Sequence, residues 1–298
     1  MALLATVKKK LISLTTDPKL FMGKAKKRLV ILMTNSLTHF IFDPLEYRLN
    51  PYPQRPEIQT PAKGFSIVMI TGGDDLSMLE MAIGSIDREL AGTPAEIIIV
   101  GPPNLKLSRS FIVPIKFLAY RDLKFLTGLI TRKKNLGASL CQYDKVVFCH
   151  DYILFEPNRK VGWDKFGDDF DVAMNKIKDK DGTRFRDWLV LDYPELGAGF
   201  LPYHAETTRY QYISGTYFVV KRDFYLANPL NDKLRWGEGE DIEWSYRVRS
   251  KTIFKFNPYS SVQCAKQKGH IKEWDNNTLA LENIFSVSAP RDFSLKQE

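Results

Sequence analysis

Cysteine is scarce in this chain of 298 residues. The three cysteines, Cys141, Cys149 and Cys264, are odd in number, widely spaced and outside any C-x-x-C arrangement. This pattern excludes a disulfide framework, a cysteine zinc site and a dithiol redox motif. Free thiols fit a reducing compartment, so we expect a cytoplasmic protein.

Long apolar runs are also missing. The longest uncharged apolar-rich run, Leu29–Phe42, has 14 residues and is interrupted by polar side chains, whereas a membrane-spanning helix needs about 20 mostly apolar residues. Apolar residues precede the first lysines, which is the reverse of a signal peptide, and no small-residue cleavage site follows. We therefore expect neither a signal peptide nor a transmembrane helix.

Both common nucleotide-binding motifs are absent. The chain has no P-loop, and the first strand-to-helix turn reads Thr71-Gly72-Gly73-Asp74-Asp75 instead of G-x-G-x-x-G. This excludes the dinucleotide-binding fingerprint. The acidic turn also argues against a sugar-nucleotide pyrophosphorylase, which relies on a Gly-rich basic loop after its first strand.

Most of the chain has little excess charge. The net charge is +8, but residues 1–28 hold eight lysines or arginines and one acid, Asp17, which accounts for +7. Because phosphate neutralisation drives nucleic-acid binding, a nearly neutral body predicts no nucleic-acid partner. Within residues 1–28, apolar residues at helical spacing predict basic amphipathic helices that either lie on an anionic membrane surface or cap the core.

The pattern divides the chain into three parts. Residues 1–49 are the basic helical segment, residues 50–63 contain four prolines and form a linker, and residues 64–298 form the main domain. Apolar runs in the first half of the domain predict four parallel strands, with a helix at Leu76–Leu90 and a loop and helix at Leu126–Gln142. These strands are Phe65–Ile70, Glu96–Val100, Ile115–Ala119 and Lys145–Cys149.

The second half is more mixed. Helices are expected near Asn158 and Glu240. Strands are expected at Asp171–Met174, Trp188–Asp192, Thr216–Val220 and Ile253–Phe256.

Two stretches contain residues suited to chemistry. In YDKVVFCHDYILFEP a buried strand delivers Asp151, beside His150, to its carboxyl end, where parallel sheets bind ligands. Asp151 is either a ligand-facing acid or a turn cap, and His150 is either functional or a buried, hydrogen-bonded histidine.

The second stretch is SGTYFVVKRDF followed by LRWGEGEDIEWSYRV, where Glu240 and Asp241 open a helix. The helix N-terminus stabilises carboxylates, so Asp241 should stay ionised. The alternative is that both are ordinary first-turn acids. Glu243 and Arg247 have the i,i+4 spacing of an ion pair on a solvated face.

Together with FSIVMIT, EIIIVG and TRKKNLGASL, these stretches resemble, in order, the GT-A glycosyltransferases, especially the inverting family 2 enzymes. The resemblance covers Phe65 to His270. It implies an α/β fold with a mixed, mainly parallel Rossmann-like sheet flanked by helices. It also implies a nucleotide-sugar donor, UDP-linked as the first choice, and a glycan or lipid-linked saccharide acceptor.

The resemblance assigns roles to individual residues. Asp241 would be the catalytic base, and Glu240 would either orient it or bind the acceptor. Asp151, with His270, would hold Mn²⁺ or Mg²⁺. The donor-binding set would be Thr71 and Asp74 at the nucleotide base, Lys134 and Asn135 ahead of a helix near the phosphates and ribose, Asp151, and Gly215 before a strand that runs under the donor sugar. The alternatives are turn chemistry for Thr71 and Asp74 and a solvated basic loop for Lys134 and Asn135.

Two departures bear on these roles. Where the family usually offers two carboxylates, this chain reads Cys149-His150-Asp151-Tyr152, and where an acid often follows the second strand it reads Gly101-Pro102-Pro103. Metal dependence and nucleotide identity therefore stay open. Trp236 is either an acceptor-stacking ring or a core residue.

The sequence thus predicts an inverting glycosyltransferase that extends a surface polysaccharide or glycolipid. The basic leader with DPKLF resembles bacterial capsule and lipopolysaccharide transferases, and it would hold the protein at the inner face of the cytoplasmic membrane. The alternative is a catalytically inactive GT-A-like partner or membrane-binding module, which the missing second carboxylate makes conceivable.

Overall fold

The computed structural model describes residues 38–53, 60–123, 128–205, 209–269 and 271–286. The chain divides into two units after Pro51. In the described part of the first unit, a π-helical turn at Thr38–Phe42 is followed by helix α3, Asp43–Leu49, which has a proline in its first turn. The amphipathic helices expected in residues 1–28 lie outside the described residues. No described helix is both long and apolar enough to cross a membrane.

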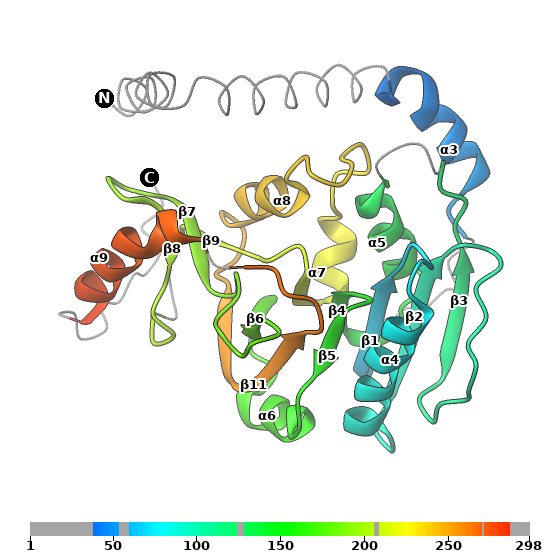
Figure 1. The fold of residues 1–298 in the computed structure, drawn as a ribbon, viewed down its shortest axis with the longest axis horizontal. Helices are drawn as coiled ribbons and strands as arrows, with labels where there is room; N and C mark the ends of the chain where they lie inside the picture. Colours follow the sequence, from blue (N-terminus) through cyan, green and yellow to red (C-terminus); the bar gives the residue numbers. More distant parts are fainter. Residues whose placement is uncertain (1–37, 54–59, 124–127, 206–208, 270, 287–298) are drawn as a thin grey trace. The chain divides into compact units, whose positions relative to one another are not determined.

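The second unit is built on an eight-stranded sheet in the order β3-β2-β1-β4-β10-β6-β11-β5 (Figure 1). The strands are β1 Ala62–Ile70, β2 Ala95–Gly101, β3 Ile115–Ala119, β4 Tyr143–His150, β5 Ile153–Phe155, β6 Val172–Lys178, β10 Tyr217–Lys221 and β11 Lys255–Cys264.

Strand direction determines which residues meet at each edge of the sheet. Strands β1 to β4 are mutually parallel, as expected for apolar runs joined by helices. Strand β10 is antiparallel to both β4 and β6, and β11 is parallel to β6 but antiparallel to β5. The carboxyl ends of β1, β4, β6 and β11 therefore lie at the same edge as the amino ends of β5 and β10.

Helices α5, α7 and α8 cover one face of the sheet. Gly137 of α5 (Ile130–Ala138) packs against Val68 and Val100, too closely for any side chain at position 137. Phe148, the register partner of Val68, packs with its ring centre 4.6 Å from that of Tyr225 of α7 (Arg222–Ala227). The neighbouring strand β10 contacts α8 (Glu240–Val248) through the same face.

Helices α4 and α6 cover the opposite face, because side chains alternate along a strand. Phe65, three positions before Val68, contacts Trp163 of α6 (Arg159–Phe166) edge-on at 6.0 Å. The backbone N–H of Arg159 donates to Glu89 of α4 (Leu76–Leu90) at 3.1 Å. The apolar β1, β2 and β4 are thus buried on both faces.

A small second sheet lies after β6 in the chain. It has the order β8-β7-β9, with β7 Leu189–Tyr193, β8 Gly197–Phe200 and β9 Gln211–Tyr212. Helix α9, Asp275–Ser286, follows a short 3₁₀ turn at Lys272–Trp274, and Thr278 accepts a hydrogen bond from the Phe200 N–H at 3.0 Å.

The observed elements match most of the expected ones. The strand expected to end at Phe256 instead runs to Cys264, because a register shift between Asn257 and Ser261 accommodates Pro258, which has no N–H. The first strand begins at Ala62, inside the expected linker. Strands β5, β8 and β9 and helices α7 and α9 were not expected.

Candidate functional site

Thr71 and Asp151 meet at the sheet edge formed by the carboxyl ends of β1 and β4. The Thr71 hydroxyl donates to Asp151 Oδ2 at 2.7 Å, and Thr71 Oγ1 accepts from the Gly73 N–H at 3.0 Å. The two residues follow neighbouring parallel strands, so their proximity results directly from the strand order.

The carboxyl group of Asp151 is partly buried, and its contacts offset only part of the cost of burying its charge. Burial raises the pKa of Asp151, and the nearby charge of Asp75 acts in the same direction. The Thr71 hydrogen bond and the positive charge of Lys266 oppose this rise in pKa. The structure therefore favours a cation or a hydrogen-bond donor beside this acid.

Gly215, Glu240 and Asp241 form a compact group at the same edge. The Gly215 N–H donates to Asp241 Oδ2 at 2.8 Å, and the second carboxylate oxygen accepts from the Ile242 N–H at 3.0 Å. A methyl group at position 215 would lie 2.7 Å from Glu240 Oε1 and 3.0 Å from Asp241 Oδ2. Glycine is therefore required here by close approach, and it fixes Asp241 at the start of α8.

Lys134 connects this group to α5. Its buried ammonium donates to the Gly215 carbonyl oxygen at 2.7 Å and lies 3.3 Å from Glu240 Oε1. The sequence placed Lys134 and Asn135 before a helix, but both lie within α5. Lys134 thus holds two site residues in place from inside the core.

Asn135 is engaged entirely with the protein. Its amide nitrogen donates to the Leu230 carbonyl at 2.8 Å and contacts Asp232, and its oxygen accepts from the Tyr225 hydroxyl at 2.6 Å. The structure shows Asn135 as a brace for residues 230–232. The neighbouring Arg132 and Lys133 are likewise ion-paired, with Asp232 at 2.9 Å and Asp122 at 2.6 Å.

His150 is a neutral imidazole between the two groups. Burial lowers the pKa of His150 well below its usual value, and the charges of Lys134, Lys268 and Lys133 lower it further. A backbone hydrogen bond with Gly215 opposes these effects. Its buried Nε2 has no hydrogen-bond partner among the described residues, so the expectation of a fully hydrogen-bonded histidine does not hold there.

Sequence reasoning missed two lysines at this edge. Lys266 and Lys268 follow β11, and their ammonium groups lie 5.5 and 3.9 Å from the centre of the Tyr152 ring. The charges of Lys266 and Lys268 lower the pKa of Asp151 and of His150 respectively. The sequence signal for them was the stretch Lys-x-Lys-Gly. It could be placed at the site only with the knowledge that β11 extends to this edge of the sheet.

Three further residues were expected at the site, namely Asp74, Trp236 and His270. Asp74 is exposed in the turn after β1, and Asp75 caps α4 by accepting from the Met78 N–H at 2.9 Å. Trp236 is 63% exposed, so it is not a core residue. His270 lies outside the described residues. The expected pair of Glu243 and Arg247 is confirmed at 2.8 Å.

The described residues do not fit a divalent cation site. They contain no group of three or more histidine, cysteine, aspartate or glutamate side chains placed to hold a metal ion. Mn²⁺ and Mg²⁺ require several oxygen or imidazole ligands. The charge of Lys266 acts on Asp151 and that of Lys268 on the adjacent His150, and both would repel a cation there.

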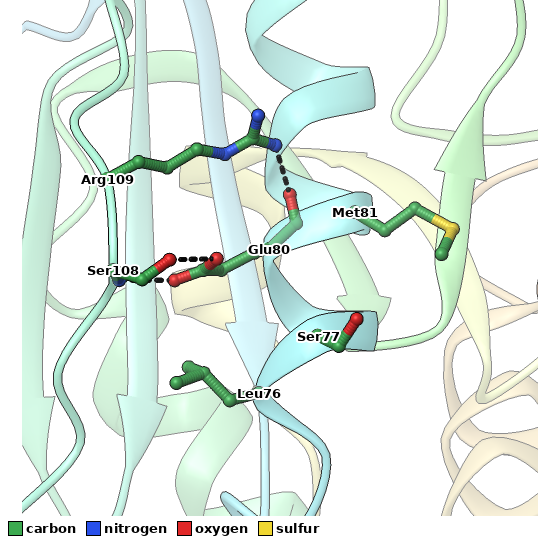
Figure 2. Close-up of a pocket in the computed structure, with 6 residues that line it drawn as sticks. All are labelled: Leu76, Ser77, Glu80, Met81, Ser108 and Arg109. Atoms are coloured by element: carbon green, nitrogen blue, oxygen red, sulfur yellow. Dashed lines mark hydrogen bonds between the residues drawn. The ribbon is translucent and has the colours of Figure 1, made fainter.

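An open cavity of about 460 Å³ lies elsewhere, against the first turns of α4 (Figure 2). Ser108 donates to the Glu80 carboxylate through its N–H and hydroxyl, and Arg109 donates to the Glu80 carbonyl at 3.1 Å. These bonds attach the loop after β2 to α4, and the Ser108 hydrogen bonds lower the pKa of Glu80. None of the strand-end acids lines this cavity.

Comparison with known proteins identifies the fold. No protein-family model matches the chain, and no curated protein matches it in sequence. The fold matches a crystal structure of GalNAc-T7 with UDP, GalNAc and Mn²⁺, with a TM-score of 0.50 and 16% sequence identity over 78% of this chain and 51% of that one. The chain thus spans about half the length of that protein. The fold is GT-A, which confirms the expected fold class.

Proposed function

We propose that this protein is a glycosyltransferase that moves a sugar from a nucleotide-sugar donor to a hydroxyl group. The observation that carries the proposal is the fixed carboxylate of Asp241, held by the Gly215 N–H at the sheet edge that also presents Thr71 and Asp151. The GT-A fold and the structure of GalNAc-T7 with UDP support a UDP-linked donor.

In the proposed reaction, Asp241 accepts the proton of the acceptor hydroxyl. The acceptor oxygen then bonds to the anomeric carbon, while the bond from that carbon to the diphosphate breaks and its electron pair leaves with the nucleoside diphosphate. Attack opposite the leaving group inverts the anomeric configuration. The hydrogen bond from Gly215 keeps Asp241 oriented for this step.

The surrounding residues position these groups. Lys134 holds Glu240 and the Gly215 carbonyl, so we assign Glu240 to orienting the acceptor beside Asp241. Thr71 and Asp74 would contact the nucleotide base and Gly215 the donor sugar. Asn135 acts through residues 230–232 instead of contacting the donor, and the exposed Trp236 would stack on an acceptor sugar.

A divalent cation was also expected, with Asp151 and His270 as ligands. Because the described residues around Asp151 do not fit such a cation, the proposed reaction has no step that depends on one. The acceptor proposed from the sequence is a growing surface polysaccharide or glycolipid. The excess positive charge of residues 1–28 would attract the protein to an anionic membrane surface that carries this acceptor.

The first test is calorimetric titration of the full chain with UDP, GDP, CDP and dTDP, in EDTA and in Mn²⁺. We expect one nucleoside diphosphate to bind clearly better than the others, which would define the donor class. Release of that diphosphate from its sugar nucleotides would then separate an enzyme from the alternative of an inactive GT-A-like partner. Absence of binding by all four under both conditions would refute the proposed function.

A further inference from the structure

We infer that Lys266 and Lys268 bind the diphosphate of the donor, so that the donor binds without a divalent cation. This inference rests on the proposed function and concerns the same site. Its basis is that both ammonium groups lie at the ring of Tyr152, the residue after Asp151, while the described residues contain no group of acids or histidines fit to hold a metal ion.

The loop that presents the lysines is firmly anchored. The Ala265 N–H donates to the Tyr152 carbonyl at 2.8 Å, one residue after Asp151. At the other end the buried carboxylate of Asp179, which follows β6, accepts from the Lys268 N–H at 2.9 Å and the Gly269 N–H at 2.8 Å. The backbone of residues 265–269 is therefore fixed before any ligand arrives.

Charge in this loop is not neutralised by the described residues. No described carboxylate lies within ion-pair distance of the ammonium group of Lys266 or Lys268, and both side chains are exposed. By contrast, the lysines of α5 are paired with Asp122 and Glu240. Lys266 and Lys268 are thus the cations available to an incoming anion.

The direction of the strands identifies which anion fits. The carboxyl end of β11 lies at the same edge as the ends of β1 and β4, which present Thr71 and Asp151. A nucleoside diphosphate bound across this edge places its phosphates beside the lysines, which donate charge-assisted hydrogen bonds to phosphate oxygens. As the glycosidic bond breaks, the same ammonium groups stabilise the negative charge on the leaving diphosphate.

The test compares the full-length wild type with the double variant Lys266→Gln and Lys268→Gln. Affinity for UDP is measured by calorimetry in EDTA and in Mn²⁺, and weak binding of uridine by ligand-observed NMR. If another nucleoside diphosphate binds best in the first test, that diphosphate is used in place of UDP and its nucleoside in place of uridine. Lys165→Gln is the matched control, because that exposed lysine lies 4.0 Å from a tyrosine ring, Tyr259, outside the site.

We expect wild type to bind UDP in EDTA, the double variant to bind it about tenfold more weakly or worse, and uridine binding to stay unchanged. Replacement of both lysines by arginine should retain most of the affinity, and the exposed positions make misfolding a minor concern. Strictly Mn²⁺-dependent UDP binding, or equal UDP affinity in the double variant, would overturn the inference but leave the proposed function intact. If no diphosphate binds wild type at all, both fail.

Discussion

Gly215 shows how one missing side chain organises the site. Replacement by alanine would put a methyl group 2.7 Å from Glu240 Oε1 and 3.0 Å from Asp241 Oδ2, so one of the acids must move. A displacement of about 1 Å can cost on the order of 100-fold in rate, so we expect Gly215→Ala to reduce diphosphate release by that order. The readout is release of UDP from UDP-glucose, UDP-galactose and UDP-N-acetylglucosamine.

Gly128→Ala is the matched control for this variant. A methyl group there would make only an ordinary contact, 3.6 Å from Asp122 Oδ1, so the release rate should not change. Equal rates in both alanine variants and wild type would mean that the close approach of Gly215 to the two acids has no role in turnover.

Asp241 is the residue on which the proposed chemistry depends most directly. Asp241→Asn keeps the size of the side chain but removes its basicity, so kcat for transfer should fall by about 10²- to 10⁴-fold with little change in UDP affinity. Glu243→Gln is the control, since Glu243 only pairs with Arg247 on the outer side of the same helix. An equal loss of kcat and UDP affinity in Asp241→Asn would indicate a structural role instead.

At the scale of elements, Asp179 positions the lysine loop without reaching the site itself. Asp179→Ala removes the acceptor for the N–H groups of Lys180, Lys268 and Gly269. The loop must then be ordered on binding, so we expect UDP affinity to fall by about three- to tenfold. Uridine affinity should not change, because the loss acts through the diphosphate.

Asp181→Ala is the comparison for this loop. Asp181 is exposed and bonds mainly to Thr183 in its own turn, with one further contact to Gln267. A loss of UDP affinity as large as that of Asp179→Ala would show that the anchoring of Lys268 and Gly269 is not what matters.

The elements also show where sequence reasoning reached its limit. Strands β1, β2 and β4 were predictable because their apolar runs are long and buried on both faces. Asp151 was found because it follows the buried strand β4, and Asp241 because it lies in the first turn of a helix that follows a Gly-rich stretch. Lys266 and Lys268 were missed because the strand before them was expected to end at Phe256, and only the bulge around Pro258 carries it to the site edge. Two-residue strands such as β9 have no periodicity to read.

Long-range partners set the remaining limit. The sequence does not reveal that Lys134 bonds to Gly215, about 80 positions away. Nor does it reveal that Asn135 bonds to Leu230, about 95 positions away. Whether a basic residue is a ligand contact or a buried brace depends on such partners. The roles of α5 could therefore be assigned only with the fold in hand.

At the scale of the whole molecule, an ion network at the opposite edge of the sheet ties its strands together. Lys145 of β4 lies 2.7 Å from Asp168 Oδ1, and Lys221 of β10 lies 3.2 Å from Asp144 and 3.5 Å from Asp168. Asp144 also accepts from the Gly64 N–H of β1 at 2.8 Å. The amino ends of β1 and β4 and the carboxyl end of β10 thus share one set of charges.

This network predicts how stability depends on pH. The Lys145 hydrogen bond, aided by the charges of Lys145 and Lys221 and the Lys63 contact, lowers the pKa of Asp168 from 3.8 to about 2. Because the folded-state pKa is the lower one, the contribution of Asp168 to the free energy of unfolding is fully present above pH 3.8 and is lost as pH falls through about 2. Asp168 is well exposed to solvent, which screens the pairs and keeps this contribution small.

The prediction is that Asp168→Asn lowers the free energy of unfolding above pH 4, and that most of the difference from wild type is lost as the pH falls from 4 to 2. Urea unfolding of both proteins between pH 5 and pH 2 measures this difference. The other carboxyl groups are the same in both proteins, so their contributions to the free energy of unfolding cancel in the difference. Asp164→Asn, which breaks only the exposed pair with Lys160, should give a much smaller difference at every pH. A difference for Asp168→Asn that is independent of pH would contradict the ionic origin. Since the network lies opposite the site edge, UDP affinity at pH 7 should equal that of wild type, which separates loss of stability from loss of function.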